Sequence, residues 1–200
     1  MAGVGAGLLG MGFARGVYYE FIAFPCGGRP YSMPLGVLFG ERPSFRVFEG
    51  TGLHGILARR GGLIYLLSPL DPLLFVESVG HSLERLLAWE GSCPRVEPSL
   101  GSWFSCTAVY ERTSGGADFY YCREFRNLSS SLLVYSRTYG CLVELLILKT
   151  KAEAGVIGKE SLEYARWLYW CVKRSSPGEE KYARVALSIL QGIEKALGLG

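Results

Sequence analysis

A short glycine-rich segment in the first third of the chain combines residue types that suit a phosphate site. Gly50 and Gly52 flank Thr51, whose hydroxyl can donate or accept a hydrogen bond. Residues 46–48 continue an alternating apolar run and predict a strand end, and the apolar spacing over 53–57 predicts a short helix. The first backbone N–H groups of such a helix have no acceptor within it, so they can hold a phosphate. Taken alone, an ordinary glycine-rich turn is the commoner explanation.

Few charged side chains elsewhere have the setting of a catalytic or binding group. Arg137 is the strongest candidate, because it opens a predicted helix and a guanidinium can bind a phosphate or carboxylate through two hydrogen bonds. A salt bridge to Glu144 or to a neighbouring subunit explains it equally well. Asp71 precedes Pro72 and has the position of a turn or capping residue. His81 has no acidic or cysteine neighbour at ligand spacing, and we expect it at the surface or at an interface.

The totals describe an ordinary globular chain. Its 200 residues, about half of them apolar and a fifth charged, are enough for one ample domain or one domain with a smaller appendix. The net charge is +3 and there is no run of like charges. Neither a nucleic acid nor a membrane surface is therefore expected as a partner.

Six cysteines are scattered through the sequence, and none forms a CxxC pair. Only two histidines could join them as ligands, so a structural zinc site is not expected, and neither is a dense disulfide framework. We expect reduced, mostly buried cysteines in a cytoplasmic protein, with a single disulfide left open as an alternative.

Most of the first two-thirds of the chain has the pattern of antiparallel β-structure. The predicted strands are 16–24, 31–39, 44–48, 63–67, 103–112 and 119–125. Residues 73–78 fit either a strand or a short helix, and residues 81–89 weakly predict a helix. Pro34 removes a hydrogen-bond donor from the second strand, so we expect that strand to lie at an edge or to bend there.

From residue 135 the apolar period changes from that of strands to that of helices. Three helices are predicted, over 137–151, 159–174 and 179–197. A β domain followed by a helical tail belongs to the α+β class. The expected organisation is a flexible or interface arm over 1–15, a barrel domain over 16–134 and a three-helix subdomain over 135–200.

Two apolar patterns predict the core of the tail. The first tail helix carries an apolar face made of Tyr139, Leu142, Val143, Leu146 and Ile147. In the second helix, Trp167 and Trp170 belong to a wide apolar girth. We expect both indoles inside the helical core rather than as a platform on which a ligand stacks.

Five segments, in the right order and spacing, resemble an uncharacterised and largely archaeal protein family. They are Tyr19-Glu-Phe-Ile-Ala, Tyr31-Ser-Met-Pro-Leu-Gly-Val, Phe48-Glu-Gly-Thr, Asp71-Pro-Leu-Leu-Phe-Val-Glu-Ser78 and Ser136-Arg-Thr-Tyr-Gly-Cys-Leu-Val-Glu-Leu145. That family is built on the FMN-binding split barrel shared with flavin reductases and pyridoxamine phosphate oxidases. The resemblance spans nearly the whole chain, although no single motif decides it.

The resemblance implies an antiparallel split β-barrel that forms a homodimer and holds FMN near the dimer interface. The strand at 31–37 would run beside the isoalloxazine ring, and the turn at Gly50 would bind the phosphate. Leu53 stands where the family has a threonine, which weakens the phosphate contacts, and His54 or Arg46 could compensate. The implied cofactor-binding residues are Ser32, Met33, Pro34, Leu35, Gly36, Arg46, Glu49, Gly50, Thr51, Gly52, His54, Asp71, Phe75 and Arg137.

The function implied by the resemblance is FMN binding, extended to an oxidoreductase of flavin-reductase type that passes hydride or electrons between a nicotinamide and an unknown acceptor. The cofactor would carry that chemistry, because the sequence contains no evident Ser-His-Asp arrangement, Walker loop or metal motif. Two alternatives stay open. One is a degenerate barrel dimer that has lost flavin and serves as a binding or scaffold protein, and the other is a barrel that binds another phosphorylated or pterin-like ligand.

Overall fold

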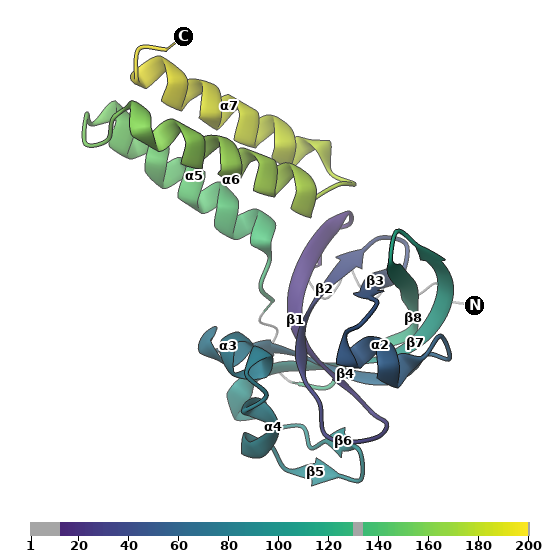
Figure 1. The fold of residues 1–200 in the computed structure, drawn as a ribbon. Helices are drawn as coiled ribbons and strands as arrows, with labels where there is room; N and C mark the ends of the chain where they lie inside the picture. Colours follow the sequence, from purple (N-terminus) through teal and green to yellow (C-terminus); the bar gives the residue numbers. More distant parts are fainter. Residues whose placement is uncertain (1–12, 130–133, 200) are drawn as a thin grey trace. The chain divides into compact units, whose positions relative to one another are not determined.

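A computed structural model describes residues 13–129 and 134–199, and this part of the chain forms two compact units. The first unit contains Tyr19–Tyr135, and the second contains Arg15–Tyr18 together with the residues from Ser136 onward. Strands dominate the first unit and helices make up most of the second (Figure 1).

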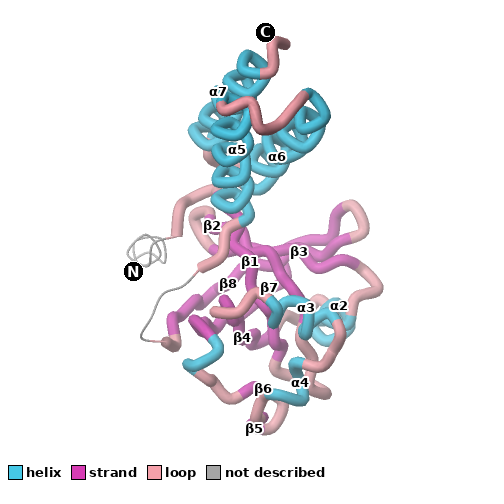
Figure 2. Tube along the Cα trace, turned by 90° about the vertical axis from the view of Figure 1, so that its left-hand side faces the viewer, coloured by secondary structure: helices cyan, strands magenta, loops and turns pink. Residues whose placement is uncertain are grey.

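The first unit is built on a closed barrel of six strands, drawn in magenta in Figure 2. The strands are β1 (Val17–Pro25), β2 (Met33–Phe39), β3 (Pro43–Phe48), β4 (Gly62–Pro69), β7 (Gly101–Ser114) and β8 (Ala117–Asn127). Around the barrel they follow the order β1-β2-β3-β8-β7-β4. The β1–β4, β2–β3, β3–β8, β4–β7 and β7–β8 ladders are antiparallel. The predicted α+β class, with a barrel and a C-terminal group of three helices, is confirmed.

Short elements fill the connections of the barrel. The helix α2 (Gly52–Leu57) follows β3, and the helices α3 (Leu73–Val79) and α4 (Leu83–Leu86) follow β4. A small hairpin, β5 (Trp89–Glu90) with β6 (Cys93–Pro94), and the 3-10 helix η1 (Pro98–Leu100) lead into β7. Residues 73–78, which fitted either a strand or a short helix, are thus helical. The helix predicted over 81–89 is shorter than expected, because the backbone is already extended at Leu87.

Aromatic rings fill the barrel interior. Phe21, Phe39, Phe104 and Phe125 are buried and contact one another with ring centroids 5.3 to 6.3 Å apart. Phe13 joins them, and its ring stacks on Phe39 at 3.9 Å. Burying so large a side chain is strongly favourable. The end of the expected N-terminal arm is therefore a core residue, whereas residues 1–12 lie outside the described residues.

A second hydrophobic cluster lies on the outside of the barrel. Successive side chains of a strand point to opposite faces, so β1 supplies Phe21 to the interior and Ile22 and Phe24 to the outside. The outer side chains pack with Leu83 and Leu87 at the two ends of α4. This packing fixes α4 on the barrel wall.

The second unit is a bundle of three helices (Figure 1). They are α5 (Arg137–Glu153), α6 (Leu162–Ser175) and α7 (Glu180–Ala196), and the 3-10 helix η2 (Lys159–Ser161) precedes α6. All three predicted tail helices are therefore present. Their buried core combines Cys141, Leu145, Leu148, Ala152, Ala165, Leu168, Cys171, Val172, Ala186, Ile189, Leu190 and Ile193.

The buried side of α5 differs from the predicted apolar face. Leu145 is fully buried, whereas Val143 and Leu146 are about half exposed. Both sides of this helix are apolar, so its periodicity alone could not choose between them. The choice depends on long-range contacts, among them the disulfide between Cys141 of α5 and Cys171 of α6.

The prediction that Trp167 and Trp170 lie inside the helical core is wrong. They are 54% and 50% exposed, whereas Ala165 and Leu168 of the same helix are buried. The apolar side chains of α6 occupy a wider arc of the helix surface than its two neighbouring helices can cover. Both indoles are therefore left at the surface.

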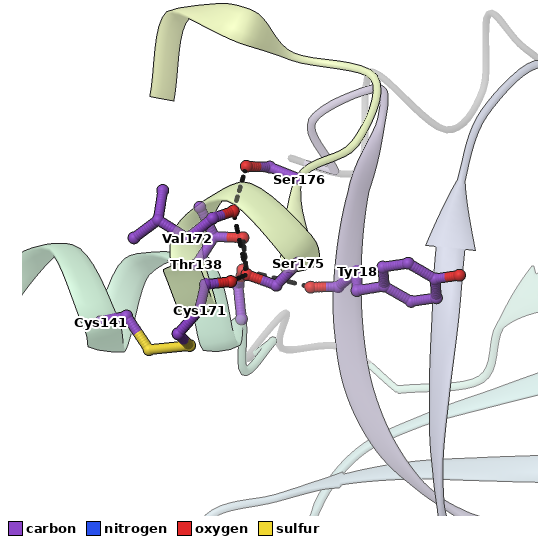
Figure 3. Close-up of a disulfide and its surroundings, with 8 residues drawn as sticks. Tyr18, Thr138, Cys141, Cys171, Val172, Ser175 and Ser176 are labelled. Atoms are coloured by element: carbon purple, nitrogen blue, oxygen red, sulfur yellow. Dashed lines mark hydrogen bonds between the residues drawn. A yellow bond between two sulfur atoms is a disulfide. The ribbon is translucent and has the colours of Figure 1, made fainter. Parts of the chain in front are cut away.

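The six cysteines form three disulfides, so the expectation of reduced cysteines is wrong. The pairs are Cys26–Cys93, Cys106–Cys122 and Cys141–Cys171. Their sequence separations of 67, 16 and 30 residues give no local signal, because tertiary structure brings the partners together. Figure 3 shows the α5–α6 disulfide beside the hydrogen bond of 2.8 Å between the Thr138 and Ser175 hydroxyls.

Candidate functional site

The glycine-rich turn after β3 has the predicted form of a strand end followed by a helix. Thr51 is the N-cap of α2, and its Oγ1 accepts a hydrogen bond from the His54 amide at 3.3 Å. The same hydroxyl donates to the Phe48 carbonyl at 2.9 Å. Gly50 has φ +84°, a backbone conformation that favours glycine. The Thr51 hydroxyl is therefore committed to the turn, and the turn offers a ligand mainly backbone N–H groups.

Tyr31 joins this turn to the start of β2. A Cβ on Gly52 would lie 2.5 Å from Cε2 of Tyr31, so the ring packs directly over the glycine. The Tyr31 hydroxyl points to the sulfur of Met33, 3.7 Å away. The two segments that the sequence analysis assigned separately to ring and phosphate binding thus meet at one place.

Glu84 of α4 anchors the start of β2. Its Oε1 accepts hydrogen bonds from the backbone amide of Ser32 at 2.6 Å and from the Ser32 hydroxyl at 2.8 Å. His81 Nδ1 lies 3.3 Å from the same oxygen, and the His81 ring lies 5.4 Å from the ring of Tyr31. The other oxygen, Oε2, is buried and has no hydrogen-bond partner within the described residues.

The environment of Glu84 favours its charged form. Burial raises the pKa of Glu84, but the hydrogen bonds from its own amide, from Ser32 and from His81 outweigh burial and bring the pKa below its usual value. Glu84 was not among the predicted site residues. His81 is exposed, as expected, but the expectation that it has no acidic neighbour is wrong. The spacing of three residues between His81 and Glu84 was the available signal.

Pro34 lies in the part of β2 that does not pair with β3. The β2–β3 ladder pairs only Val37–Phe39 with Pro43–Phe45. The expected interruption of the strand near Pro34 therefore agrees with the register. Leu35 is buried, and Gly36 is half-buried.

A second polar cluster lies beside α2, around the buried Asp118 of β8. The Asp118 carboxylate accepts hydrogen bonds from the Thr113 hydroxyl and from Arg59 Nε at 3.3 Å. His54 Nε2 lies 3.3 Å from Asp118 Oδ2. The Thr113 hydrogen bond, followed by Arg59, lowers the pKa of Asp118 despite burial, and Asp118 raises the pKa of Arg59. His54 Nε2 thus lies beside an acidic side chain, but it is buried and has no hydrogen-bond partner within the described residues.

The chain after α2 is held in a strained conformation by this cluster. Ala58 and Arg59 have φ values of +42° and +61°, in the left-handed region that side chains other than glycine seldom adopt. The backbone amide of Arg59 donates a hydrogen bond to the Tyr120 hydroxyl at 3.2 Å. The Arg59 guanidinium lies 3.9 Å from the Glu49 carboxylate. The predicted site residue Glu49 therefore faces Arg59. No sequence signal links Arg59 to Asp118, 59 residues away.

Three other predicted site residues have structural partners of their own. Arg46 lies on the exposed side of β3 with its guanidinium 5.1 Å from the Phe48 ring. Asp71 accepts a hydrogen bond from the Leu73 amide at 2.9 Å, as a capping residue does. Phe75 of α3 packs against the hydrophobic cluster on the outside of the barrel, with its ring 6.4 Å from that of Tyr135. Their contact with a cofactor stays a prediction.

Arg137 begins α5, as the sequence predicted, and belongs to the helical unit. Its contact with a ligand held by the barrel also stays a prediction. Within residues 13–129 and 134–199, no group of three or more His, Cys, Asp and Glu side chains could hold a metal ion. None of the helices described is long and apolar enough to cross a bilayer.

No family model matches the chain, and no curated protein does. One similar solved structure is that of the FMN-bound protein MM1853 from Methanosarcina mazei, of the family named DUF447. It is 19% identical, the match covers 95% of this chain and 100% of that chain, and the TM-score is 0.49. At this identity and score, the likeness carries no argument about the function of this chain.

Proposed function

We propose that the barrel unit binds FMN, with the isoalloxazine ring along the start of β2 and the phosphate at the turn before α2. The observation that carries the proposal is the packing of Tyr31 over Gly52. It joins the two segments to which the family resemblance assigns the ring and the phosphate. The closed six-stranded barrel supports the same proposal, because it is the architecture that the resemblance implies.

The residues present fit the two ends of this cofactor in different ways. For the phosphate, the first-turn N–H groups of Gly52 and Leu53 have no acceptor inside α2. For the ring, residues Ser32 to Gly36 offer backbone groups, and Glu84 holds Ser32 in position. When bound, FMN would supply the redox chemistry, and the chain would bind it, orient it and exclude water.

The experiment is a titration of the purified chain with FMN, with riboflavin as the matched ligand that lacks the phosphate. Retained absorption bands near ~370 and ~450 nm after desalting are expected with FMN, and weaker binding is expected with riboflavin. Thr51→Ala should weaken FMN binding by about fivefold through loss of the helix cap, and Thr51→Ser should restore it. A chain that takes up no FMN contradicts the proposal, and equal affinity for both ligands contradicts the phosphate site.

The proposal extends to an oxidoreductase that takes its electrons from a nicotinamide. No residue of the site is required to act as an acid or a base, since the cofactor carries the hydride chemistry. The test is an anaerobic mixture of the FMN-loaded chain with NADH or NADPH. Bleaching of the band near ~450 nm is expected. A loaded chain that neither nucleotide reduces would remain a flavin-binding protein without this activity.

The second candidate is a barrel that no longer binds flavin. It is favoured by the Thr51 hydroxyl, which the turn already uses, and by His54, which faces Asp118. Both were expected to contact the phosphate. Thermal-shift measurements with FMN, pyridoxal phosphate and a pterin separate the two candidates. A rise in melting temperature with FMN supports the flavin-binding barrel. A rise with pyridoxal phosphate or the pterin, but not with FMN, would identify another phosphorylated or pterin-like ligand.

A further inference from the structure

Three neighbouring strands of the barrel, β3, β8 and β7, carry arginines and aromatic residues on their outer face (Figure 1). Side chains along a strand alternate between its two faces. Tyr120 of β8 is fully buried and stacks on the buried Phe45, so its neighbours Phe119 and Tyr121 point outward. The set of residues called the arginine–aromatic face below consists of Arg42, Arg46, Phe48, Arg112, Phe119 and Tyr121.

The strand register brings the members of this face together. Phe119 is paired with Arg46 of β3 on one side and with Arg112 of β7 on the other. The Arg112 guanidinium lies over the Phe119 ring, 4.6 Å from its centroid. Two residues further along β8, about 7 Å away, the Arg42 guanidinium lies over the Tyr121 ring at 3.5 Å. Two rings, each covered by a guanidinium, therefore follow one another along one strand.

The face has an excess of positive charge. A single carboxylate, that of Glu111, lies 2.8 Å from Arg42 and 3.6 Å from Arg112. Within the described residues Arg46 has no carboxylate partner, and its guanidinium lies 5.1 Å from the centroid of the half-exposed Phe48 ring. The expectation of no nucleic-acid partner rests on the net charge of the whole chain, +3. A sum over the chain does not reveal where the arginines gather.

We propose that the arginine–aromatic face binds single-stranded nucleic acid. Unpaired bases stack on aromatic rings and on guanidinium planes, and arginines bind the phosphates between them. Phe119 and Tyr121 stand at the spacing at which the aromatic residues of RNA-binding sheets stack successive bases. Phe48, on the neighbouring strand, offers a further ring that is 51% exposed. The proposal concerns the outside of the barrel and does not depend on flavin binding.

Other partners match this face less completely. An apolar protein surface would meet guanidinium groups, whose burial without an acidic partner is costly. An acidic peptide would satisfy the arginines but would supply no flat rings to stack on them. A nucleic-acid duplex offers phosphates, but its bases are already stacked on one another. A single strand is the partner that supplies both negative charge and free base surfaces.

The test is the fluorescence anisotropy of labelled oligo(dT) and oligo(U) strands titrated with the full chain at low salt. Binding is expected, and the affinity should fall as salt rises, because arginines displace counterions from the phosphates. A duplex of the same length should bind more weakly. Arg46→Glu should weaken binding on the order of tenfold. Arg95→Glu, the same change at an exposed position after β6, is the matched control and should have a smaller effect.

The aromatic part of the face has its own variant. Phe48→Ala removes a ring and no charge, so it should weaken binding by about tenfold through lost stacking, and Phe48→Tyr should restore it. Arg46, Phe48 and Arg95 are exposed, so all these variants should keep the wild-type circular dichroism and melting temperature.

Four results would overturn the proposal. The first is a wild-type chain that binds neither strand at low salt. The second is an equal loss in Arg46→Glu and Arg95→Glu, because the attraction would then come from overall charge. The third is full affinity in Phe48→Ala, which would mean that no base stacks on that ring. The fourth is equally tight binding of the duplex or of heparin, because the face would then attract any polyanion.

Discussion

The ring of Tyr31 lies over Gly52 so closely that no side chain can replace the hydrogen on that glycine without moving the ring. Tyr31 leads into β2, and Gly52 is the first residue of α2. The contact therefore ties the strand that would face the flavin ring to the turn that would face its phosphate. Substitutions at these two residues test whether the contact matters.

Gly52→Ala should couple energetically to Tyr31. In the wild type, the added Cβ forces the Tyr31 ring away from the turn. In a Tyr31→Ala background, the same change only adds a better helix former and should stabilise by about 0.5–1 kcal/mol. A double-mutant cycle in urea should give a coupling of about 1–2 kcal/mol. Gly55→Ala, which has open space around its Cβ position, is the control and should be stabilising in both backgrounds.

Glu84→Ala should destabilise the barrel unit by about 1–3 kcal/mol, because it leaves the Ser32 amide without its acceptor. Glu84→Gln keeps one acceptor oxygen and should cost less. Urea unfolding of the two variants measures the difference. His81→Ala, which removes an exposed ring from the same carboxylate, serves as the control. Equal stability of Glu84→Ala and the wild type would show that the anchor is unimportant.

Asp118 should make the protein acid-sensitive. Its folded-state pKa is lowered from the usual 3.8, mainly by the Thr113 hydrogen bond and then by Arg59. Its stabilising contribution is therefore present above about pH 4 and is lost as the pH falls through the lowered folded-state pKa. Melting temperatures measured between pH 7 and pH 3 should fall less steeply for Asp118→Asn than for the wild type. Glu90→Gln, at an exposed position, should keep the wild-type slope.

Removing the Cys141–Cys171 disulfide should destabilise the helical unit by about 3 kcal/mol, because the bond closes a long loop of the unfolded chain. Urea unfolding followed by tryptophan fluorescence measures the loss in the paired serine variant. The corresponding Cys106 and Cys122 variant should instead destabilise the barrel. A wild type unaffected by reducing agent would contradict the prediction.

The disulfides also bear on the predicted cytoplasmic location. Disulfides are rare in the cytosol of mesophiles, although intracellular proteins of hyperthermophiles contain many. Alkylation of free thiols in a fresh lysate, followed by mass spectrometry of the Cys26 and Cys93 peptides, measures whether the pairs exist in the cell. Alkylated cysteines would show that the reduced form is the cellular one.

The sequence alone predicted the elements that carry a strong local pattern. The run of strand-forming residues up to Phe24 and the turn at Gly50 to Gly52 identified β1 and α2, because strand propensity and helix periodicity act over a few residues. The change of period near residue 135 identified the three tail helices and so the α+β class. Residue types singled out the Gly50 turn as a candidate binding segment, whereas only the family resemblance assigned that role to Tyr31 to Gly36.

Tertiary structure decided which of these residues meet and which faces are covered. It placed Glu84 on Ser32, Asp118 on Arg59 and each cysteine beside its partner. It also left Trp167 at the surface, although its pattern suits a core residue equally well. The physical reason is that burial and hydrogen bonding depend on which distant elements pack together, and an apolar stripe or a lone carboxylate looks the same in sequence whether or not a partner covers it.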